Sequence, residues 1–414
     1  MRIAREQYIQ KAFPRETELR NTLITIVVAD KQSIATDVSI IFCPCAAMNV
    51  SMDSSDSEPQ SLIFLHGVGS SATLISSSSI AALREKYNVY VIDIPGFGTS
   101  NTSVSLASLS TDLCLEYYSQ FFDKLLAELA LKQPLVVAHS VGSFLAVHSM
   151  RNWDRKRIGG IVMVSPAGIL PTLTAAGAYW ALLFKAGLPM SLFRCFGSTI
   201  SSFLFLPLLG STTCARTIYW LQMQSSMSMV NIPSKFIHLG FATSYWAHPQ
   251  LNDILRSKLK FGMIWGEKDD LMPLETGRLL VDIGRKLGKK FVLEPVPGAG
   301  HSPFHVNGGT DFVQALHKVV AQMEASDSSA PDGMDDSEGQ NAGEAVDVSV
   351  CQGNDSAAHT VHNVDEIVHL ERGKWRSSFS MQATRKRVKA LHEAIEAAVD
   401  SYVQRTKSGP GWCS

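Results

Sequence analysis

Short apolar runs separated by turn residues recur along most of the chain, and they predict a sheet of largely buried strands. Runs of this kind, rich in Val and Ile, are typical of strands that are covered on both faces. The first two, 18–29 and 36–43, are predicted to be antiparallel edge strands. The remaining predicted strands are 61–65, 89–93, 135–138 and 158–164, and two more open the stretches that begin at Lys260 and Phe291.

Apolar residues at helical spacing mark three further segments. Residues 110–131 carry one apolar stripe, which we interpret as a face packed on the core. Residues 143–150 continue from the strand at 135–138, and residues 311–323 are predicted to form the last helix of the fold. The stripe of the first segment consists of Leu113, Tyr117, Phe121, Leu125, Leu126 and Leu129.

A serine lies between the buried strand at 135–138 and the helix that follows it. Ser140 has small residues two positions before and after it, Ala138 and Gly142, which allow a tight turn without a side-chain clash. Such a turn lifts the hydroxyl above the sheet and points the first amides of the helix toward it. We interpret this turn, with His139 beside the serine, as a nucleophile elbow.

Two later stretches carry candidate catalytic groups just after a strand. In the first, four charged residues compete for the position of a catalytic acid: Glu267, Lys268, Asp269 and Asp270. In the second, the turn at residues 297–300 leads directly into His301, and His305 follows one helical turn later. A serine, an acid and a histidine in this order could form a proton-transfer chain.

The order of these motifs resembles that of the α/β-hydrolase superfamily, in which a serine, an acid and a histidine each follow a strand. The resemblance extends from about Ser61 to Met323. It implies an α/β fold, with a mostly parallel eight-stranded sheet flanked by helices and an inserted helical cap.

The resemblance also implies a catalytic triad of Ser140, Asp269 and His301. Asp269 fits the superfamily pattern Gly-x-x-Asp-x-x-x-Pro, with Asp270 as the runner-up, and His301 matches the Gly-His position. His305 is interpreted as a neighbour of the base.

Two further positions are weaker candidates for the acid. Some lipases place it after the strand at 158–164, but Ser165 and Pro166 stand there and offer no carboxylate. Asp93 also ends a strand, but it precedes the serine, and the resemblance gives it a structural role in the turn that follows.

The segment His66-Gly67-Val68-Gly69 follows the strand at 61–65 directly. In the superfamily, the amide after His-Gly supplies half of the oxyanion hole. This maps to the N–H of Val68, with the N–H of Val141 as the other half. Two preorganised donors of this kind are each worth about 3 kcal/mol in acyl transfer. The alternative is that the glycines only make a turn.

Residues 168–250 interrupt the alternation of strands and helices and carry few charges. We interpret them as a helical cap with an apolar underside that suits a long acyl chain, and with an outer face that can rest on a membrane. The alternative is that they pack against the core. The run 195–215 is long enough to cross a bilayer, but Gly197, Pro207 and Gly210 interrupt it.

Residues 325–371 are predicted to be a disordered acidic linker, because no Lys or Arg occurs between Lys318 and Arg372. A basic amphipathic helix then begins at 385–389, and it is a second candidate for peripheral membrane contact or for pairing with a partner. The alternative is a solvated appended helix. The expected organisation is an N-terminal extension (1–17), a hydrolase core (18–167 and 251–324), a cap (168–250), a linker (325–371) and a tail (372–414).

Composition narrows the functional classes. The net charge of the 414 residues is −1, which weighs against a nucleic-acid partner. Seven scattered cysteines form no disulfide framework, and no second Cys pair at zinc spacing follows Cys43 and Cys45, so neither a metal nor a cofactor is expected. The N-terminus lacks the apolar core of a secretory signal. An intracellular location is expected, either cytoplasmic or peripheral on a membrane. The N-terminal arginines are compatible with a mitochondrial import signal, but the nearby glutamates weaken that interpretation.

These patterns together predict a serine hydrolase that cleaves carboxylic esters of apolar, lipid-like substrates through an acyl-enzyme. The elbow and the apolar cap are most similar to a lipid-acting branch of lysophospholipases, N-acyl-phospholipid lipases and cardiolipin deacylases. Val306 departs from the acidic residue that often follows the histidine in that branch, so acyl transfer to lysolipids is not predicted. The alternatives are an amide or C–C bond hydrolase with the same triad, or a non-catalytic lipid-binding scaffold.

Overall fold

A computed structural model of the chain describes part of its 414 residues. The predicted cap, most of the predicted linker, the basic tail helix, Val68 and Asp270 lie outside this part. The described residues are 2–29, 32–46, 59–67, 70–73, 75–104, 106–150, 153, 156–167, 254, 257–269, 272–286 and 289–325.

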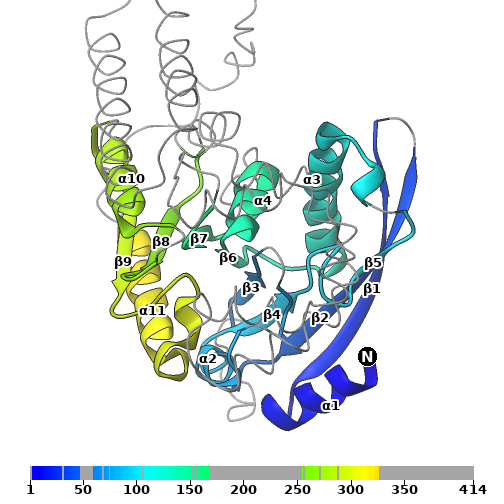
Figure 1. Cartoon of the computed structure of the whole chain (residues 1–414), viewed down its shortest axis with the longest axis horizontal. Helices are drawn as coiled ribbons and strands as arrows, with labels where there is room; N and C mark the ends of the chain where they lie inside the picture. The colour runs from blue at the N-terminus through cyan, green and yellow to red at the C-terminus, as the bar shows by residue number, and fades with distance from the viewer. Residues whose placement is uncertain are drawn as a thin grey trace, which may run out of the picture.

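The described residues form one mostly parallel sheet (Figure 1). Its order is β1-β2-β4-β3-β6-β7-β8-β9, with β5 paired to β2. The β1–β2, β2–β4 and β2–β5 pairs are antiparallel, and the other pairs are parallel. The strands are β1 (Glu18–Val27), β2 (Ser33–Cys43), β3 (Ser61–Leu65), β4 (Asn88–Ile92), β5 (Asn101–Thr102), β6 (Leu135–His139), β7 (Gly160–Val164), β8 (Phe261–Gly266) and β9 (Val292–Val296).

The predicted fold class is confirmed, with two corrections to the sheet. The described residues contain nine strands instead of eight, because the two-residue strand β5 pairs with Thr36 and Asp37 of β2. A strand this short leaves no periodic signal in the sequence. Strand β2 is an interior strand and not an edge, since it pairs with β1 along its length and with β4 through residues 40–43.

Helices cover both faces of the sheet (Figure 1). One apolar cluster joins the sheet to α3, α4 and α10, and a second joins it to α1, α2 and α11. Most of the predicted stripe of α3 is fully buried, with Leu113 and Leu129 at its margin. The helices are α1 (Arg2–Ala12), α2 (Ser77–Leu83), α3 (Thr111–Glu128), α4 (Val141–Met150), α10 (Leu274–Lys286) and α11 (Thr310–Ala325), with short 3-10 turns at Leu106–Ser108 and Pro303–Gly309.

Helix α1 occupies an N-terminal segment for which the sequence pattern predicted no element. Ile9 and the following Phe13 are buried in the same apolar cluster as α2 and α11. An ion pair between Glu16 and Arg84, with an N–O distance of 2.5 Å, ties the segment to the end of α2. The N-terminal residues are therefore packed against the core formed by the sheet, α2 and α11.

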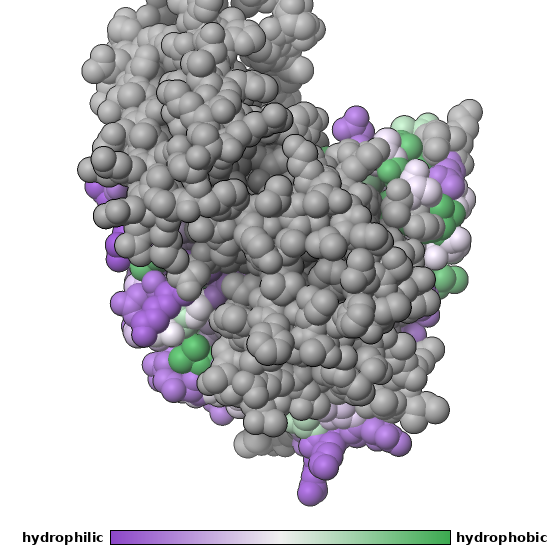
Figure 2. Space-filling model, in the orientation of Figure 1, coloured by the Kyte–Doolittle hydropathy of each residue, from purple (hydrophilic) through white to green (hydrophobic). Residues whose placement is uncertain are grey.

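Exposed apolar residues gather along the outer strand. Leu19, Leu23 and Val27 of β1 are exposed by 38%, 69% and 47%. Figure 2 shows apolar and polar residues mixed on the side of the molecule where Figure 1 draws β1 and β2. None of the helices in the described ranges has the length and apolar composition needed to cross a bilayer.

Candidate active site

The nucleophile elbow is a sharp turn between β6 and α4. Ser140 is the single residue between the end of the strand and the start of the helix, and its φ is +53°. This left-handed conformation costs a non-glycine residue about 1–2 kcal/mol. The main chain holds it in place, since the Ser140 N–H donates to the Val164 carbonyl and the Ser140 carbonyl accepts from Ala167 and Ser143. The turn therefore stores local strain beneath a presented hydroxyl.

Gly142 allows the new helix to start against the neighbouring strand. Strands β3 and β6 are parallel, with Leu65 opposite Ala138, so both end at the same edge of the sheet. A Cβ atom at position 142 would lie 2.5 Å from the His66 carbonyl oxygen and 3.0 Å from that of Leu65. Any side chain here would push α4 away from the end of β3.

The predicted acid and the predicted base follow the ends of adjacent parallel strands. Asp269 follows strand β8 and His301 follows strand β9. In the parallel pairing of these two strands, Gly266 lies opposite Val296. The His301 Nδ1 atom lies 2.9 Å from Asp269 Oδ2, and the His301 Nε2 atom lies 3.0 Å from Ser140 Oγ. The structure thus brings together the three residues that the sequence singled out.

The partners of His301 fix its tautomer. An ionised carboxylate only accepts, so Nδ1 carries the proton and donates to Asp269. The Nε2 lone pair then faces Ser140 and accepts from its hydroxyl. The Asp269 side chain is fully buried, and 10% of the His301 side chain is exposed. This arrangement can remove the serine proton and stabilise the resulting imidazolium.

The loops that carry Asp269 and His301 are joined to one another. The Lys268 N–H donates to the Ala299 carbonyl at 2.7 Å, and the Gly298 N–H donates to the Glu267 carboxylate at 2.9 Å. Glu267 was a competing candidate for the acid, and the structure directs it to a main-chain amide away from His301. Asp269 in turn accepts from the Met272 N–H at 2.8 Å through its second oxygen, which orients the carboxylate.

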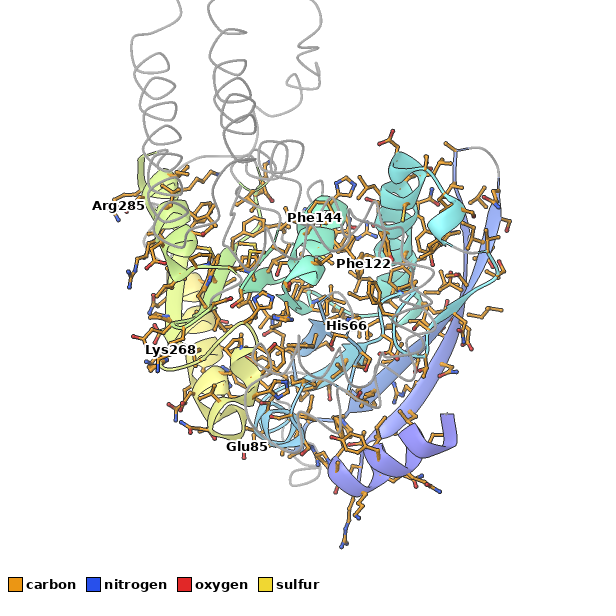
Figure 3. The ribbon with its side chains drawn as sticks, in the orientation of Figure 1. His66, Glu85, Phe122, Phe144, Lys268 and Arg285 are labelled. Atoms are coloured by element: carbon orange, nitrogen blue, oxygen red, sulfur yellow. The ribbon has the colours of Figure 1, made fainter. Side chains whose placement is uncertain are left out.

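Val141 and Gly67, two of the residues expected around the oxyanion hole, lie beside Ser140. Val141 is the first residue of α4, so its N–H has no carbonyl partner within the helix. Gly67 packs so closely that a Cβ atom there would be 3.0 Å from Ser140 Cβ. His66 lies in the interior (Figure 3), where Nδ1 donates to the Gly67 carbonyl at 2.7 Å and Nε2 accepts from the Ile94 N–H at 3.0 Å.

Asp93 organises the turn that follows β4, in keeping with the structural role predicted for it. Its buried carboxylate accepts from the Ala72 N–H at 2.6 Å and from the Thr99 N–H at 2.8 Å, and Thr99 Oγ1 also donates to it. A Cβ atom at Gly98 would lie 2.3 Å from the Asp93 carboxyl carbon, so the turn at 94–99 wraps tightly around it.

His305 lies four residues after His301 and has no described hydrogen bond to Ser140, Asp269 or His301. Its Nε2 atom has no hydrogen-bond partner in the part of the chain that the structure describes, and burial lowers its pKa from 6.5 to about 4. Within the same ranges, no group of three or more His, Cys, Asp or Glu is arranged to hold a metal ion.

Solved structures of other proteins share this fold at low sequence identity. A membrane phospholipase A, described as a bacterial virulence factor, has a TM-score of 0.53 and 14% identity over 73% of this chain and 87% of its own. Carboxylesterase CesB from Bacillus subtilis has a TM-score of 0.53 and 14% identity, over 78% and 97%. Esterase RhEst1 from Rhodococcus has a TM-score of 0.52 and 14% identity, over 73% and 99%. At such identity the likeness concerns the fold alone.

No curated protein matches the sequence at a significant level. The model of one protein family, described as the alpha/beta hydrolase family, matches residues 62–315. This match covers more than half of the chain and includes the elbow, the acid loop and the histidine turn. The chain therefore belongs to the alpha/beta hydrolase family.

Proposed function

We propose that the protein is a serine hydrolase that cleaves carboxylic ester bonds through an acyl-enzyme. The observation that carries this proposal is the buried chain of hydrogen bonds from Ser140 Oγ through His301 to Asp269. A serine is a weak nucleophile unless a neighbouring base removes its proton during attack. In the tautomer assigned to His301, the unprotonated Nε2 atom lies 3.0 Å from Ser140 Oγ and can accept the serine proton.

The proposed reaction proceeds in two halves. Ser140 Oγ attacks the ester carbonyl carbon while its proton passes to His301 Nε2, and the main-chain amides of Val141 and Val68 stabilise the oxyanion. The C–O bond then breaks, His301 gives its proton to the departing alcohol, and an acyl-enzyme remains. A water molecule attacks the acyl carbon with His301 as the base, which releases the carboxylic acid and restores Ser140.

We assign apolar, lipid-like esters as the substrate class. The support is the apolar sequence of residues 168–250, which lies between β7 and β8 along the chain. The structural neighbours also include a phospholipase A as well as esterases. Within this class, we propose lysophospholipids or related acylated phospholipids as substrates, met at a membrane surface through the predicted cap and the predicted C-terminal basic helix.

Labelling of the purified protein with a fluorophosphonate probe tests the proposal, with Ser140→Ala and His301→Ala as variants. We expect the wild type to label and both variants to lose the label. Folded wild type that stays unlabelled, both alone and with liposomes, would remove the case for catalysis and favour a lipid-binding scaffold. A panel of esters, amides and C–C substrates then separates the reaction classes.

A further inference from the structure

His139 is the last residue of β6 and directly precedes the nucleophile. Its side chain turns into the protein and only 3% of the residue is exposed. The ring Nε2 atom lies 2.8 Å from the main-chain carbonyl oxygen of His301. A carbonyl oxygen only accepts hydrogen bonds, so Nε2 of His139 carries a proton and donates it.

The second ring nitrogen of His139 is closely enclosed. Nδ1 has no hydrogen-bond partner among the described residues, and a Cβ atom at Gly67 would lie 3.0 Å from it. The ring also packs edge to face against Phe304, with centroids 5.0 Å apart, and its centroid is 4.9 Å from that of His301. The ring is therefore held by packing on several sides, and its one described hydrogen bond goes to the base.

From these contacts we infer that His139 is a positioning residue, which aligns the catalytic base with the nucleophile by anchoring the His301 main chain to strand β6. His301 follows Gly298, whose φ is +67°, and Gly300, so its own turn imposes few steric limits. The bond from His139 ties this turn to the residue next to Ser140. It joins two segments 162 residues apart without involving a reacting atom.

The charge of the ring agrees with this role. Burial, together with the adjacent His301, holds the pKa of His139 well below its usual range, so the ring is neutral at neutral pH. His301 becomes positively charged during the proposed reaction. A second positive ring at a centroid distance of 4.9 Å would oppose that charge, whereas a neutral ring does not.

The inference rests on the proposed function, and its test is the kinetics of fluorophosphonate inactivation at pH 8. The variants are His139→Phe, which removes the donor and keeps a ring, and His139→Gln, whose amide can donate in place of Nε2. We expect the maximal inactivation rate of His139→Phe to fall about 10- to 100-fold, as for a misplaced catalytic group. The probe's apparent binding constant should stay within about twofold, and His139→Gln should recover most of the rate.

The matched control is His305→Phe and His305→Gln. His305 is a second mostly buried histidine of the same region, with no described bond to the triad, so both control variants should react at the wild-type rate. The role of His139 would be overturned if folded His139→Phe reacted at the wild-type rate. It would also be overturned if the inactivation rate of His139→Gln fell as far as that of His139→Phe. Either result would leave the proposed function intact. Absence of labelling in the wild type would overturn both.

One measurement on the wild type does not depend on how well the variants fold. The ¹⁵N chemical shifts of the His139 ring distinguish a protonated from an unprotonated nitrogen. We expect Nε2 of His139 to be protonated and Nδ1 to be unprotonated. Protonation at Nδ1 alone would overturn the inference, because Nε2 could then not donate to His301.

Discussion

Gly142 of the elbow and the His66 carbonyl at the end of β3 touch with no room for a methyl group, since a Cβ atom at 142 would lie 2.5 Å from that oxygen. The start of α4 and the segment expected to hold the oxyanion are therefore fitted to one another by main-chain contact. This contact sets how closely the start of α4 approaches the end of β3, and it gives the first prediction.

Gly142→Ala should lower the free energy of unfolding by about 1–3 kcal/mol, the usual cost of overpacking, and should also slow fluorophosphonate labelling. Urea unfolding and labelling rates measure the two effects. Gly298→Ala is the control, because a Cβ atom there meets nothing within 4 Å and only its φ of +67° disfavours alanine. Because Gly298→Ala carries a backbone cost of its own, the labelling rates decide: equal rates for the two variants would mean that the close approach at Gly142 has no consequence for the site.

Because the backbone is strained at Ser140, we expect its glycine and alanine variants, both inactive, to differ in stability. Ser140→Gly should be more stable than Ser140→Ala by about 1 kcal/mol, because glycine adopts the observed φ of +53° without a steric cost. Ser140→Ala should be close to the wild type. Thermal or urea unfolding of the three proteins checks this, and a less stable glycine variant would contradict the strained turn.

Asp269→Asn should lower kcat by about 10⁴-fold and leave the fold intact. The Met272 N–H would retain the amide oxygen, which turns the amide NH₂ toward His301. His301 Nδ1 would then have to accept, and its proton would move to Nε2, where the ring can no longer act as a base. Ester hydrolysis measures the loss.

Glu267→Gln is the matched control for the acid. Its amide oxygen can still accept from the Gly298 N–H, so we expect less than a tenfold change in kcat. If Glu267→Gln reduced kcat as much as Asp269→Asn, the assignment of the acid to Asp269 would be wrong.

Asp93→Ala should destabilise the protein by about 3 kcal/mol, because it leaves the buried N–H of Ala72 and two partly buried donors of Thr99 without their acceptor. The folded fraction should still label at Ser140, since the aspartate organises a turn and takes no part in proton transfer. Asp282→Ala, which removes only an exposed pair with Arg285, should change stability by less than about 0.5 kcal/mol. Loss of labelling in folded Asp93→Ala would contradict the structural role.

His305 predicts a pH dependence of stability. Burial lowers its pKa from 6.5 to about 4, so the unfolded chain binds a proton more readily than the folded one. The neutral His305 ring makes its full contribution to the free energy of unfolding above about pH 6.5, and this contribution is lost as the pH falls toward about 4. The unfolding free energy of the wild type should therefore fall more steeply than that of His305→Gln, by up to about 1.4 kcal/mol per pH unit in this window. Parallel curves from urea unfolding would contradict the prediction.

Much of the fold follows from residues that are close in sequence. Apolar runs placed the buried strands to within a few residues, and the stripe from Leu113 to Leu129 identified α3 and the face that it buries. Small residues on either side of Ser140 were enough to predict a tight turn there. These features depend on local sterics and on the alternation of apolar and polar positions, both of which a sequence displays directly.

Contacts between distant segments were decided only by the tertiary structure. Residue types alone left four charged positions open for the acid, and only the family pattern pointed to Asp269; the structure sets Asp269 against His301 and Glu267 against the Gly298 N–H. The packing of α1 on the core and the pairing of β5 with β2 likewise leave no local signal. The bond from His139 to the His301 carbonyl has the same origin, because it exists only once β6 and the turn after β9 meet at one edge of the sheet.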